Sequence, residues 1–294
     1  MKWQVIDART LRGWPLPAVA DDADKEGRGR VLVAGGSREI AGAVQLAAVS
    51  ALRAGAGKLV IAAPRAVAPH MSQVVPEARV IAVEENEAGS FRAGISEALA
   101  DTLRGTAVVL AGPGTMDPSG SVAFVSNLLE QCKRVPVILD AGAMEIAREM
   151  PRFAQPVLLT PHAGEMAHLL GIAKDDVVAA ADRVALDAAR RWNAVVALKG
   201  ATTWIATPDG RGWRHDGAEP GLATSGSGDV LAGLVAGFAA RNVPLEQACA
   251  WGVVVHALAG QALARRLGPL GFLARELPDC VPALLKRWRA PTAA

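Results

Sequence analysis

Seven short apolar runs, most of them followed by small or polar residues, constrain the fold more than any other feature of the sequence. They are VLVAGG (31–36), KLVIAAP (58–64), ARVIAV (78–83), AVVLAGPG (107–114), VPVILDAG (135–142), PVLLTPH (156–162) and AVVALKG (194–200). Runs this apolar are typical of strands buried on both faces, as in a parallel sheet. They therefore predict an α/β protein.

The remaining segments supply helices and one hairpin. Apolar periodicity predicts helices over 41–54, 91–103, 176–192, 230–241, 245–266 and 276–288. TTWIATPDG and GWRHDG meet at an Asp-Gly turn and predict a β-hairpin. This order predicts a doubly wound, mostly parallel sheet with helices on both faces. We assign 1–29 as an N-terminal lead-in and 30–290 as a single domain.

Composition excludes several classes of protein. Hydrophobic residues make up 51% of the 294 residues, enough for a sizeable core, and the net charge of +2 comes without a basic stripe, which argues against nucleic-acid binding. The three cysteines are far apart and predict neither a disulfide framework nor a zinc site. The N-terminus has no signal-peptide pattern, and the uncharged stretch 247–264 suits a buried core helix better than a membrane span. We therefore expect a cytoplasmic protein without a membrane or nucleic-acid partner.

The sharpest motif is TSGSGD (224–229), which runs straight into the apolar segment VLAGLVAGFAAR. A helix start exposes unpaired backbone N–H groups and a partial positive charge, and glycines let the backbone approach a phosphate closely. Asp229 is either a group that meets a substrate hydroxyl or an ordinary N-cap, and spacing alone leaves both readings open. In either role, we expect the helix start to stabilise the ionised carboxylate of Asp229 at neutral pH.

Other polar residues follow the predicted strands, whose carboxyl ends build the ligand site in sheets of this kind. Lys199 ends an apolar run beside Gly200, which favours a functional role. Glu165 is either functional or a first-turn helix acid, and His162 taken alone reads as a loop histidine. Asp140 is either an acid on the ligand side or a cap for the next turn, and both remain open.

At this point the sequence resembles a known family. The ordered motifs GRGRVLVAGGSREIAGA, AGPGT, LDAGA, LTPHAGEMAHLLG, LKGATT and TSGSGDVLAG are similar to those of the NAD(P)H-hydrate dehydratases, in the ribokinase-like superfamily. The resemblance spans roughly residues 25–265. It implies that a nucleotide, ADP or ATP, phosphorylates the hydroxyl of hydrated NADH or NADPH. Phosphate then leaves, which yields the reduced cofactor and, from ADP, AMP.

The resemblance also implies roles for individual residues. Asp229 would be the catalytic base, beside an anion hole formed by Gly226, Ser227 and Gly228. The nucleotide would contact Gly228 and the segment Lys199, Gly200, Ala201, Thr202 and Thr203. The hydrated dinucleotide would contact Ala43, Gly114, His162 and Asp229. Glu165 would organise Mg²⁺, directly or through water, and His162 stands where the wider superfamily has Asn.

Two other functions stay open at this stage. One is a small-molecule kinase of the same fold, such as one that phosphorylates hydroxyethylthiazole, and the other is an inactive nucleotide-binding regulator. Only about thirty residues precede the first predicted strand, so we expect no epimerase domain of the kind often fused to this family. We also expect a homo-oligomer, with a tetramer as one arrangement. The sequence does not decide between ADP and ATP, or between NADH hydrate and NADPH hydrate.

Overall fold

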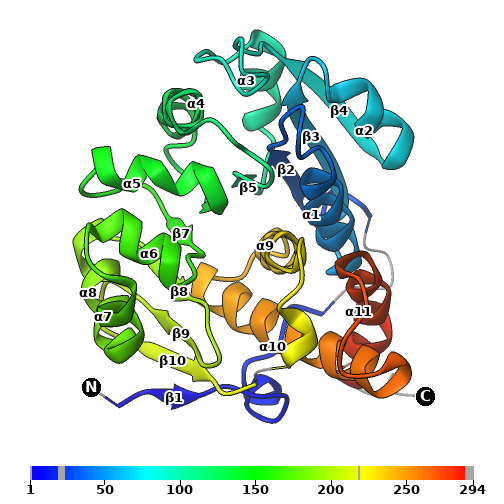
Figure 1. The fold of residues 1–294 in the computed structure, drawn as a ribbon. Coiled ribbons are helices and arrows are strands. Elements are labelled where there is room, and N and C mark those ends of the chain that lie inside the picture. The colour runs from blue at the N-terminus through cyan, green and yellow to red at the C-terminus, as the bar shows by residue number, and fades with distance from the viewer. Residues whose placement is uncertain (1, 19–23, 218, 289–294) are drawn as a thin grey trace.

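A ten-stranded sheet organises the computed structural model, which describes residues 2–18, 24–217 and 219–288 (Figure 1). The strand order is β1-β10-β9-β8-β7-β6-β5-β2-β3-β4. All seven predicted strands are confirmed and run parallel: β2 (Arg30–Ala34), β3 (Lys58–Pro64), β4 (Ala78–Val83), β5 (Val108–Ala111), β6 (Val137–Leu139), β7 (Val157–Leu159) and β8 (Val195–Leu198). The predicted hairpin forms antiparallel β9 (Thr203–Ala206) and β10 (Gly212–His215).

Successive side chains of the strands enter two different cores, because they point to opposite faces of the sheet. Val31 and Val33 belong to one core, and Leu32 and Ala34 to the other. The first core is covered by α1 (Gly42–Arg53), α2 (Ala68–Val74), α9 (Ser227–Ala239), α10 (Leu245–Leu267) and α11 (Leu277–Leu285). The second is covered by α3 (Glu97–Leu103), α4 (Pro118–Gln131), α5 (Ile146–Glu149), α6 (Ala163–Leu170), α7 (Lys174–Ala179) and α8 (Ala181–Trp192). Helices on both faces confirm the predicted layers.

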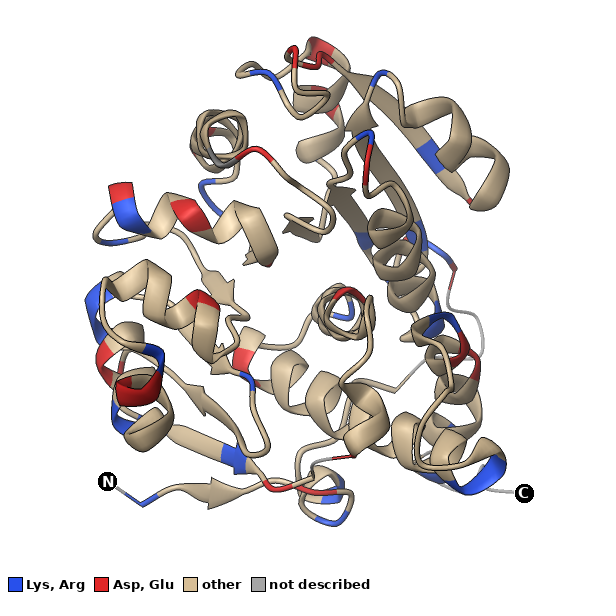
Figure 2. Ribbon diagram, viewed as in Figure 1, with Lys and Arg blue, Asp and Glu red and all other residues tan. Residues whose placement is uncertain are grey.

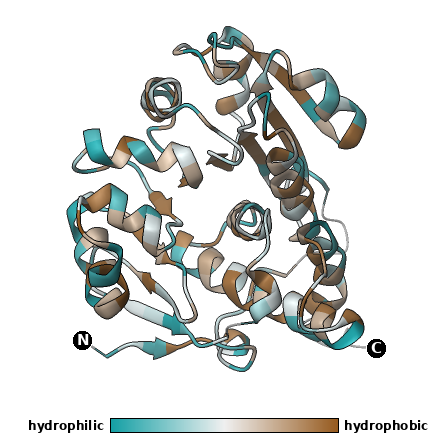
Figure 3. Ribbon diagram, in the orientation of Figure 1, coloured by the Kyte–Doolittle hydropathy of each residue, from teal (hydrophilic) through white to brown (hydrophobic). Residues whose placement is uncertain are grey.

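Hydrophobic residues follow the strands at the centre of this arrangement, as the colouring of β2 and β3 shows (Figure 3). Among the described residues, only α10 is long and apolar enough to cross a membrane, and 78% of its apolar window is buried inside the structure. This placement agrees with the core helix predicted there. Charged residues are sparse on α10 and frequent on the outer helices α7 and α8 (Figure 2).

Two predicted helices are shorter or interrupted. The helix predicted over 91–103 is wrong in its first half: Phe91 pairs with Glu85 in a β-bridge, and α3 begins only after Ser96, whose hydroxyl caps the Leu99 N–H. The helix predicted over 176–192 is broken at Ala180, whose φ of −135° and ψ of 37° lie outside the helical region. Apolar periodicity continues across both positions, so it did not reveal these breaks.

The predicted lead-in contributes a strand of its own. β1 (Gln4–Val5) pairs in parallel with β10 and so forms the edge of the sheet. The single domain assigned to 30–290 stays a prediction, since the described contacts set no boundary at residue 30.

The strand order places a topological switch between β2 and β5. The chain moves from β2 outward to β3 and β4, and then returns to the other side of β2 to form β5. Loops after neighbouring strands diverge at such a point and leave a crevice at the carboxyl ends of the strands. The predicted loops AGGS (34–37) and AGPGT (111–115) flank this switch.

Candidate active site

Two glycine-containing loops meet at the switch between β2 and β5. The Gly36 N–H donates to the Pro113 carbonyl at 2.7 Å. A Cβ on Gly114, whose φ is +73°, would lie 2.4 Å from the Ile40 carbonyl oxygen and 3.0 Å from the Ala43 Cβ. Only glycine allows this approach, and it brings together Ala43 and Gly114, two of the predicted substrate contacts.

The start of α9 faces the site with a glycine loop. Gly226 precedes the helix with a φ of 86°, and a Cβ there would lie 2.5 Å from Leu46 Cδ1. The helix begins at Ser227, three residues before the predicted start, so the predicted anion hole is the first helical turn and its preceding residue. Ser227 Oγ lies 3.1 Å from His256 Nε2 on the buried helix α10. The backbone N–H groups of this first turn have no partners within the helix, which makes them suited to an anion, although the Ser227 N–H donates to the Thr224 carbonyl at 3.2 Å.

Asp229 is the third residue of α9, and the N-cap position belongs to Gly226. The N-cap alternative is therefore wrong. The expected stabilisation of its carboxylate is also wrong in direction. Burial, together with the negative charge of Asp140, raises the pKa of Asp229 to about 6, although the Lys199 ammonium acts in the opposite direction. The partial positive charge at the start of α9 lowers the pKa of Asp229 less than burial raises it, because removal of water penalises the charged form.

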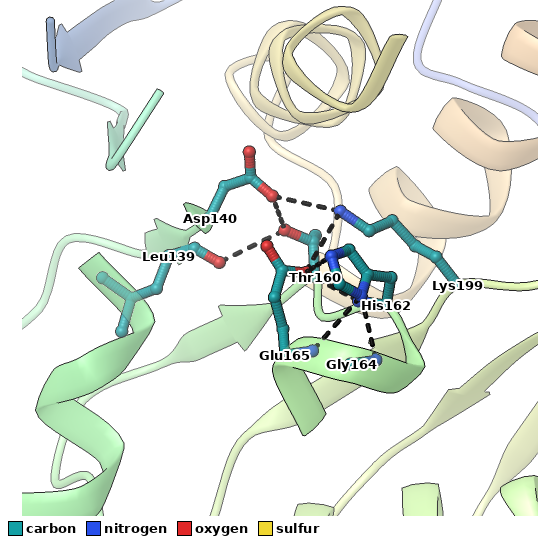
Figure 4. Close-up of polar contacts among 7 residues, drawn as sticks. All are labelled: Leu139, Asp140, Thr160, His162, Gly164, Glu165 and Lys199. Atoms are coloured by element: carbon teal, nitrogen blue, oxygen red, sulfur yellow. Dashed lines mark hydrogen bonds and ion pairs between the residues drawn. The ribbon is translucent and has the colours of Figure 1, made fainter. Parts of the chain in front are cut away.

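Lys199 follows β8 and points into a group of carboxylates (Figure 4). Its Nζ lies 3.4 Å from Asp140 Oδ1 and 3.9 Å from Glu165 Oε2. Burial alone would lower the pKa of the Lys199 ammonium, but the charges of Asp140 and Glu165 outweigh it and raise that pKa. A Cβ on Gly228 would lie 3.6 Å from the same Nζ, so the ammonium adjoins the glycine loop of α9.

His162 and Glu165 cap the start of α6 reciprocally. His162 Nδ1 accepts from the N–H groups of Gly164 and Glu165 at 3.0 and 3.2 Å, and Glu165 Oε2 accepts from the His162 N–H at 2.7 Å. Nδ1 of His162 thus accepts the capping hydrogen bonds at the start of α6. An Asn side chain, which the wider superfamily has at this position, can cap a helix in the same way. The first-turn interpretation of Glu165 is confirmed, and the same carboxylate still reaches toward Lys199.

The segment 200–203 leads from Lys199 into β9. Gly200 and Ala201 are exposed, and the Thr202 hydroxyl donates to Asp216 Oδ1 at 2.9 Å. Thr203 is the first residue of β9. The segment therefore directly follows Lys199 along the chain, and its first two residues are open to solvent. Its contact with a nucleotide stays a prediction.

Sequence reasoning left three site residues outside the predicted set. Asp140 is 4% exposed, lacks a capping hydrogen bond, and accepts from the Thr160 hydroxyl at 2.6 Å. The ligand-side alternative for Asp140 is the one the structure favours. Burial lowers the pKa of His256 to about 4, so its imidazole is neutral beside Ser227. The only histidine in the uncharged stretch 247–264 was the available signal for His256, and the sequence gave no signal for Thr160.

A cavity of about 260 Å³ extends from this site between α6 and the 3-10 helix Ala141–Glu145 that precedes α5. It is lined by Ala141, Met144, Glu145, His162, Gly164, Glu165, His168 and Leu169. Because His162 and Glu165 line it, this space is continuous with the group of side chains around Lys199.

Within the described residues, no three His, Cys, Asp or Glu side chains are grouped so as to hold a metal ion. Glu165 still offers a carboxylate oxygen at the mouth of the site. Mg²⁺ is usually held by one or two carboxylates and completed by waters and substrate phosphates. The residues present therefore fit Mg²⁺ that arrives with a nucleotide, and they do not form a cage of their own.

Comparison with known proteins decides the family. The model of the NAD(P)H-hydrate dehydratase family matches residues 31–283. The ADP-dependent (S)-NAD(P)H-hydrate dehydratase of Xanthomonas campestris is 47% identical over 97% of this chain and 96% of that protein. The chain belongs to the NAD(P)H-hydrate dehydratase family. It is therefore an enzyme of the lyase class, as the resemblance of its motifs implied.

A solved member of the family has the same fold. The ADP/ATP-dependent NAD(P)H-hydrate dehydratase of Bacillus subtilis, co-crystallised with ATP and Mg²⁺, superimposes with a TM-score of 0.85 at 28% identity and covers 98% of this chain and 100% of that one. This likeness confirms the ribokinase-like fold. Other relatives are longer: the chain spans 49% of a bifunctional NAD(P)H-hydrate repair enzyme from Moorella thermoacetica, with 37% identity over 88% of this chain.

Proposed function

We propose that the protein restores hydrated NADH or NADPH by ADP-dependent dehydration. The observation that carries the proposal is the convergence of Asp229, Lys199 and the glycine loop of α9 at one end of the sheet. A base, a cation and a backbone anion hole are what phosphorylation of a hydroxyl requires.

Asp229 would take the proton of the added hydroxyl as its oxygen attacks the terminal phosphorus of ADP. The bond from that phosphorus to the AMP oxygen breaks, so AMP departs and a phosphate ester remains. Phosphate then leaves with the electrons of the C–O bond, and the neighbouring ring carbon gives up its proton to the departing phosphate or to water as the nicotinamide double bond re-forms. Phosphate is a far better leaving group than hydroxide, which explains the use of a nucleotide. A pKa near 6 makes Asp229 a stronger base than an ordinary aspartate, yet leaves it ionised at neutral pH.

The first turn of α9 would hold the phosphates of the nucleotide. Gly226, Ser227 and Gly228 would present backbone N–H groups there, with that of Ser227 exchanging its bond to the Thr224 carbonyl for one to phosphate, and the Lys199 ammonium lies against the same loop. The remaining nucleotide contacts would come from 200–203. Ala43, Gly114 and His162 would contact the hydrated dinucleotide and hold its hydroxyl toward Asp229.

Mg²⁺ bound with the nucleotide would neutralise phosphate charge. Glu165 is the residue of this chain proposed to hold it, directly or through water. Glu165→Gln should therefore raise the Mg²⁺ concentration needed for half-maximal rate, measured from initial rates over a Mg²⁺ series. An unchanged Mg²⁺ dependence would limit Glu165 to capping α6 and contacting Lys199.

The direct test is to incubate the protein with hydrated NADH, ADP and Mg²⁺. Recovery of reduced-nicotinamide absorbance, together with AMP and free phosphate, is the expected result. A stable phosphorylated product would instead indicate a kinase of this fold, and nucleotide binding without any turnover would indicate a regulator. ATP in place of ADP, and hydrated NADPH in place of hydrated NADH, then measure both preferences.

The state and location of the protein are part of the same proposal. We infer a cytoplasmic enzyme that acts on small molecules and assembles as a homo-oligomer, with a tetramer as one arrangement. Light scattering of the purified chain measures this assembly.

A further inference from the structure

Asp140 is the most buried charged group of the site, and the predicted chemistry gives it no role. It follows β6 and is 4% exposed. Its Oδ1 accepts from the Thr160 hydroxyl at 2.6 Å, after β7, and lies 3.4 Å from Lys199 Nζ, after β8. Three neighbouring strand ends thus contribute one side chain each to a single chain of contacts (Figure 4).

The backbone around Asp140 is held as firmly as its side chain. A Cβ on Gly112 would lie 1.7 Å from the Asp140 carbonyl oxygen, so the end of β5 approaches this residue as only glycine can. The next residue, Ala141, has a φ of 47°, which is rare for a residue with a side chain. Strained backbone of this kind persists where surrounding contacts fix it, and it is frequent at functional sites.

The Lys199 ammonium needs a fixed partner such as Asp140, because other carboxylates also attract it. Its Nζ lies 3.9 Å from Glu165 Oε2, at the mouth of the site, and it also feels the charge of Asp229. Asp140 lies deeper than Glu165, whose side chain is 27% exposed. A fixed carboxylate on the inner side therefore keeps the ammonium beside Gly228, instead of letting it follow Glu165 toward solvent.

We propose that Asp140, held by Thr160, is a positioning residue that keeps the Lys199 ammonium at the glycine loop of α9, where the transferred phosphate is bound. This rests on the proposed function for the identity of the phosphate. Asp140 does not touch the reacting atoms. Its effect on the reaction passes through Lys199.

The test is a double-mutant cycle with Asp140→Asn, which keeps the shape and an oxygen for Thr160 but loses the charge, and Lys199→Gln. Asp140→Asn should lower kcat about tenfold to a hundredfold, as coupled charged neighbours do. The KM for ADP should not rise, because one negative charge near the phosphates is gone. In the Lys199→Gln background the same substitution should lower kcat less than about threefold. Equal losses in both backgrounds, or a normal kcat in Asp140→Asn, would overturn the proposal.

Thr160→Val tests the same chain of contacts without touching a charge. It should lower kcat about threefold to tenfold, and Thr160→Ser, which keeps the hydroxyl, should restore it. Thr106→Val is the matched control, because Thr106 is also buried but donates to the Thr102 carbonyl away from the site. Equal effects of the two valine variants on kcat would assign Thr160 to stability alone. If Asp140→Asn does not fold, the comparison of Thr160→Val with Thr106→Val still tests the proposal.

The cycle is repeated with ADP affinity, measured by calorimetry, as the readout. Loss of affinity on Lys199→Gln should be smaller when Asp140 is already Asn, because the ammonium is then no longer held in place. This readout needs no turnover of hydrated cofactor. An absence of repair by the unmodified protein would therefore reject the proposed function, whereas independent effects in the binding cycle would reject the role of Asp140.

Discussion

Two groups of polar and charged side chains lie near α6, and they differ in how far their cations are buried. The inner cluster consists of Asp140, Thr160 and Lys199, and the outer cluster of Glu145, Arg148 and His168. Asp140 and Lys199 have side chains 5% and 19% exposed. In the outer cluster, Arg148 and His168 are 51% and 56% exposed, whereas Glu145, at 19%, is as buried as Lys199. The shorter ion contact lies outside: His168 Nε2 is 2.8 Å from Glu145, against 3.4 Å between Lys199 and Asp140.

Distance alone therefore ranks these contacts in the wrong order. Coulomb energy varies inversely with the local dielectric constant, which changes far more between surface and interior than 0.6 Å changes the separation. The outer contacts also compete, because His168 Nε2 lies 3.2 Å from Arg148 Nη1 and one ring nitrogen cannot both donate to Glu145 and accept from arginine. Burial of both charges makes the inner cluster the one in which we expect a substitution to have the larger effect.

The largest expected effect comes from removal of the inner cation. Lys199→Met leaves the buried Asp140 carboxylate without its counter-charge, so we expect the free energy of unfolding to fall by about 2–4 kcal/mol. Turnover should fall about a hundredfold to a thousandfold, the usual cost of one preorganised electrostatic group. Urea denaturation and initial rates measure these effects. Adding Asp140→Asn should recover stability but not turnover, and an unchanged unfolding free energy in Lys199→Met would contradict the comparison.

A smaller effect should follow from pH, through the charges that the inner cluster places near Asp229. Because the pKa of Asp229 is about 6 and its ionised form is the proposed base, kcat/KM should be level above that pH. It should fall about tenfold per unit below it. Asp140→Asn removes a like charge, so the fall should move to lower pH. A profile that stays level down to pH near 4 in the unmodified enzyme, or a shift to higher pH in the variant, would contradict this.

The smallest effect is expected from the outer cluster. Arg148→Ala should lower the free energy of unfolding by less than about 1 kcal/mol, because solvent screens an exposed pair. The difference should shrink further at high salt. Urea denaturation at low and high ionic strength gives both values. A loss as large as that of Lys199→Met would show that exposure is the wrong basis for ranking the two clusters.

The sequence predicted what is written locally in the chain. Seven apolar runs became the seven parallel strands, and the small residues of 224–229 lead into α9 as expected. Lys199 was also singled out, because it directly follows an apolar run, and Glu165 because it falls in the first turn of a predicted helix and matches a motif of the family. The break of the predicted helix at Ala180 was not visible, since no proline or glycine marks it.

The contacts within the site could not be predicted, because they depend on which strand ends become neighbours in the sheet. Asp140 lies 59 positions from Lys199 along the chain, and only the sheet order brings them together. The pKa of Asp229 moved opposite to expectation for the same reason. A helix start is visible in the sequence, whereas burial and the approach of Asp140 arise from packing.

Asp229→Asn tests the central claim, that this carboxylate is the base in repair of hydrated NAD(P)H. The variant keeps size and shape but cannot accept the proton, so turnover with hydrated NADH and ADP should fall at least about a hundredfold. Stability should not fall at neutral pH. A raised carboxyl pKa stabilises the fold only while the group is protonated, and this contribution is lost as pH rises through about 6. The result that would contradict the account is a folded Asp229→Asn protein, of unchanged melting temperature, that repairs hydrated NADH at a near-normal rate.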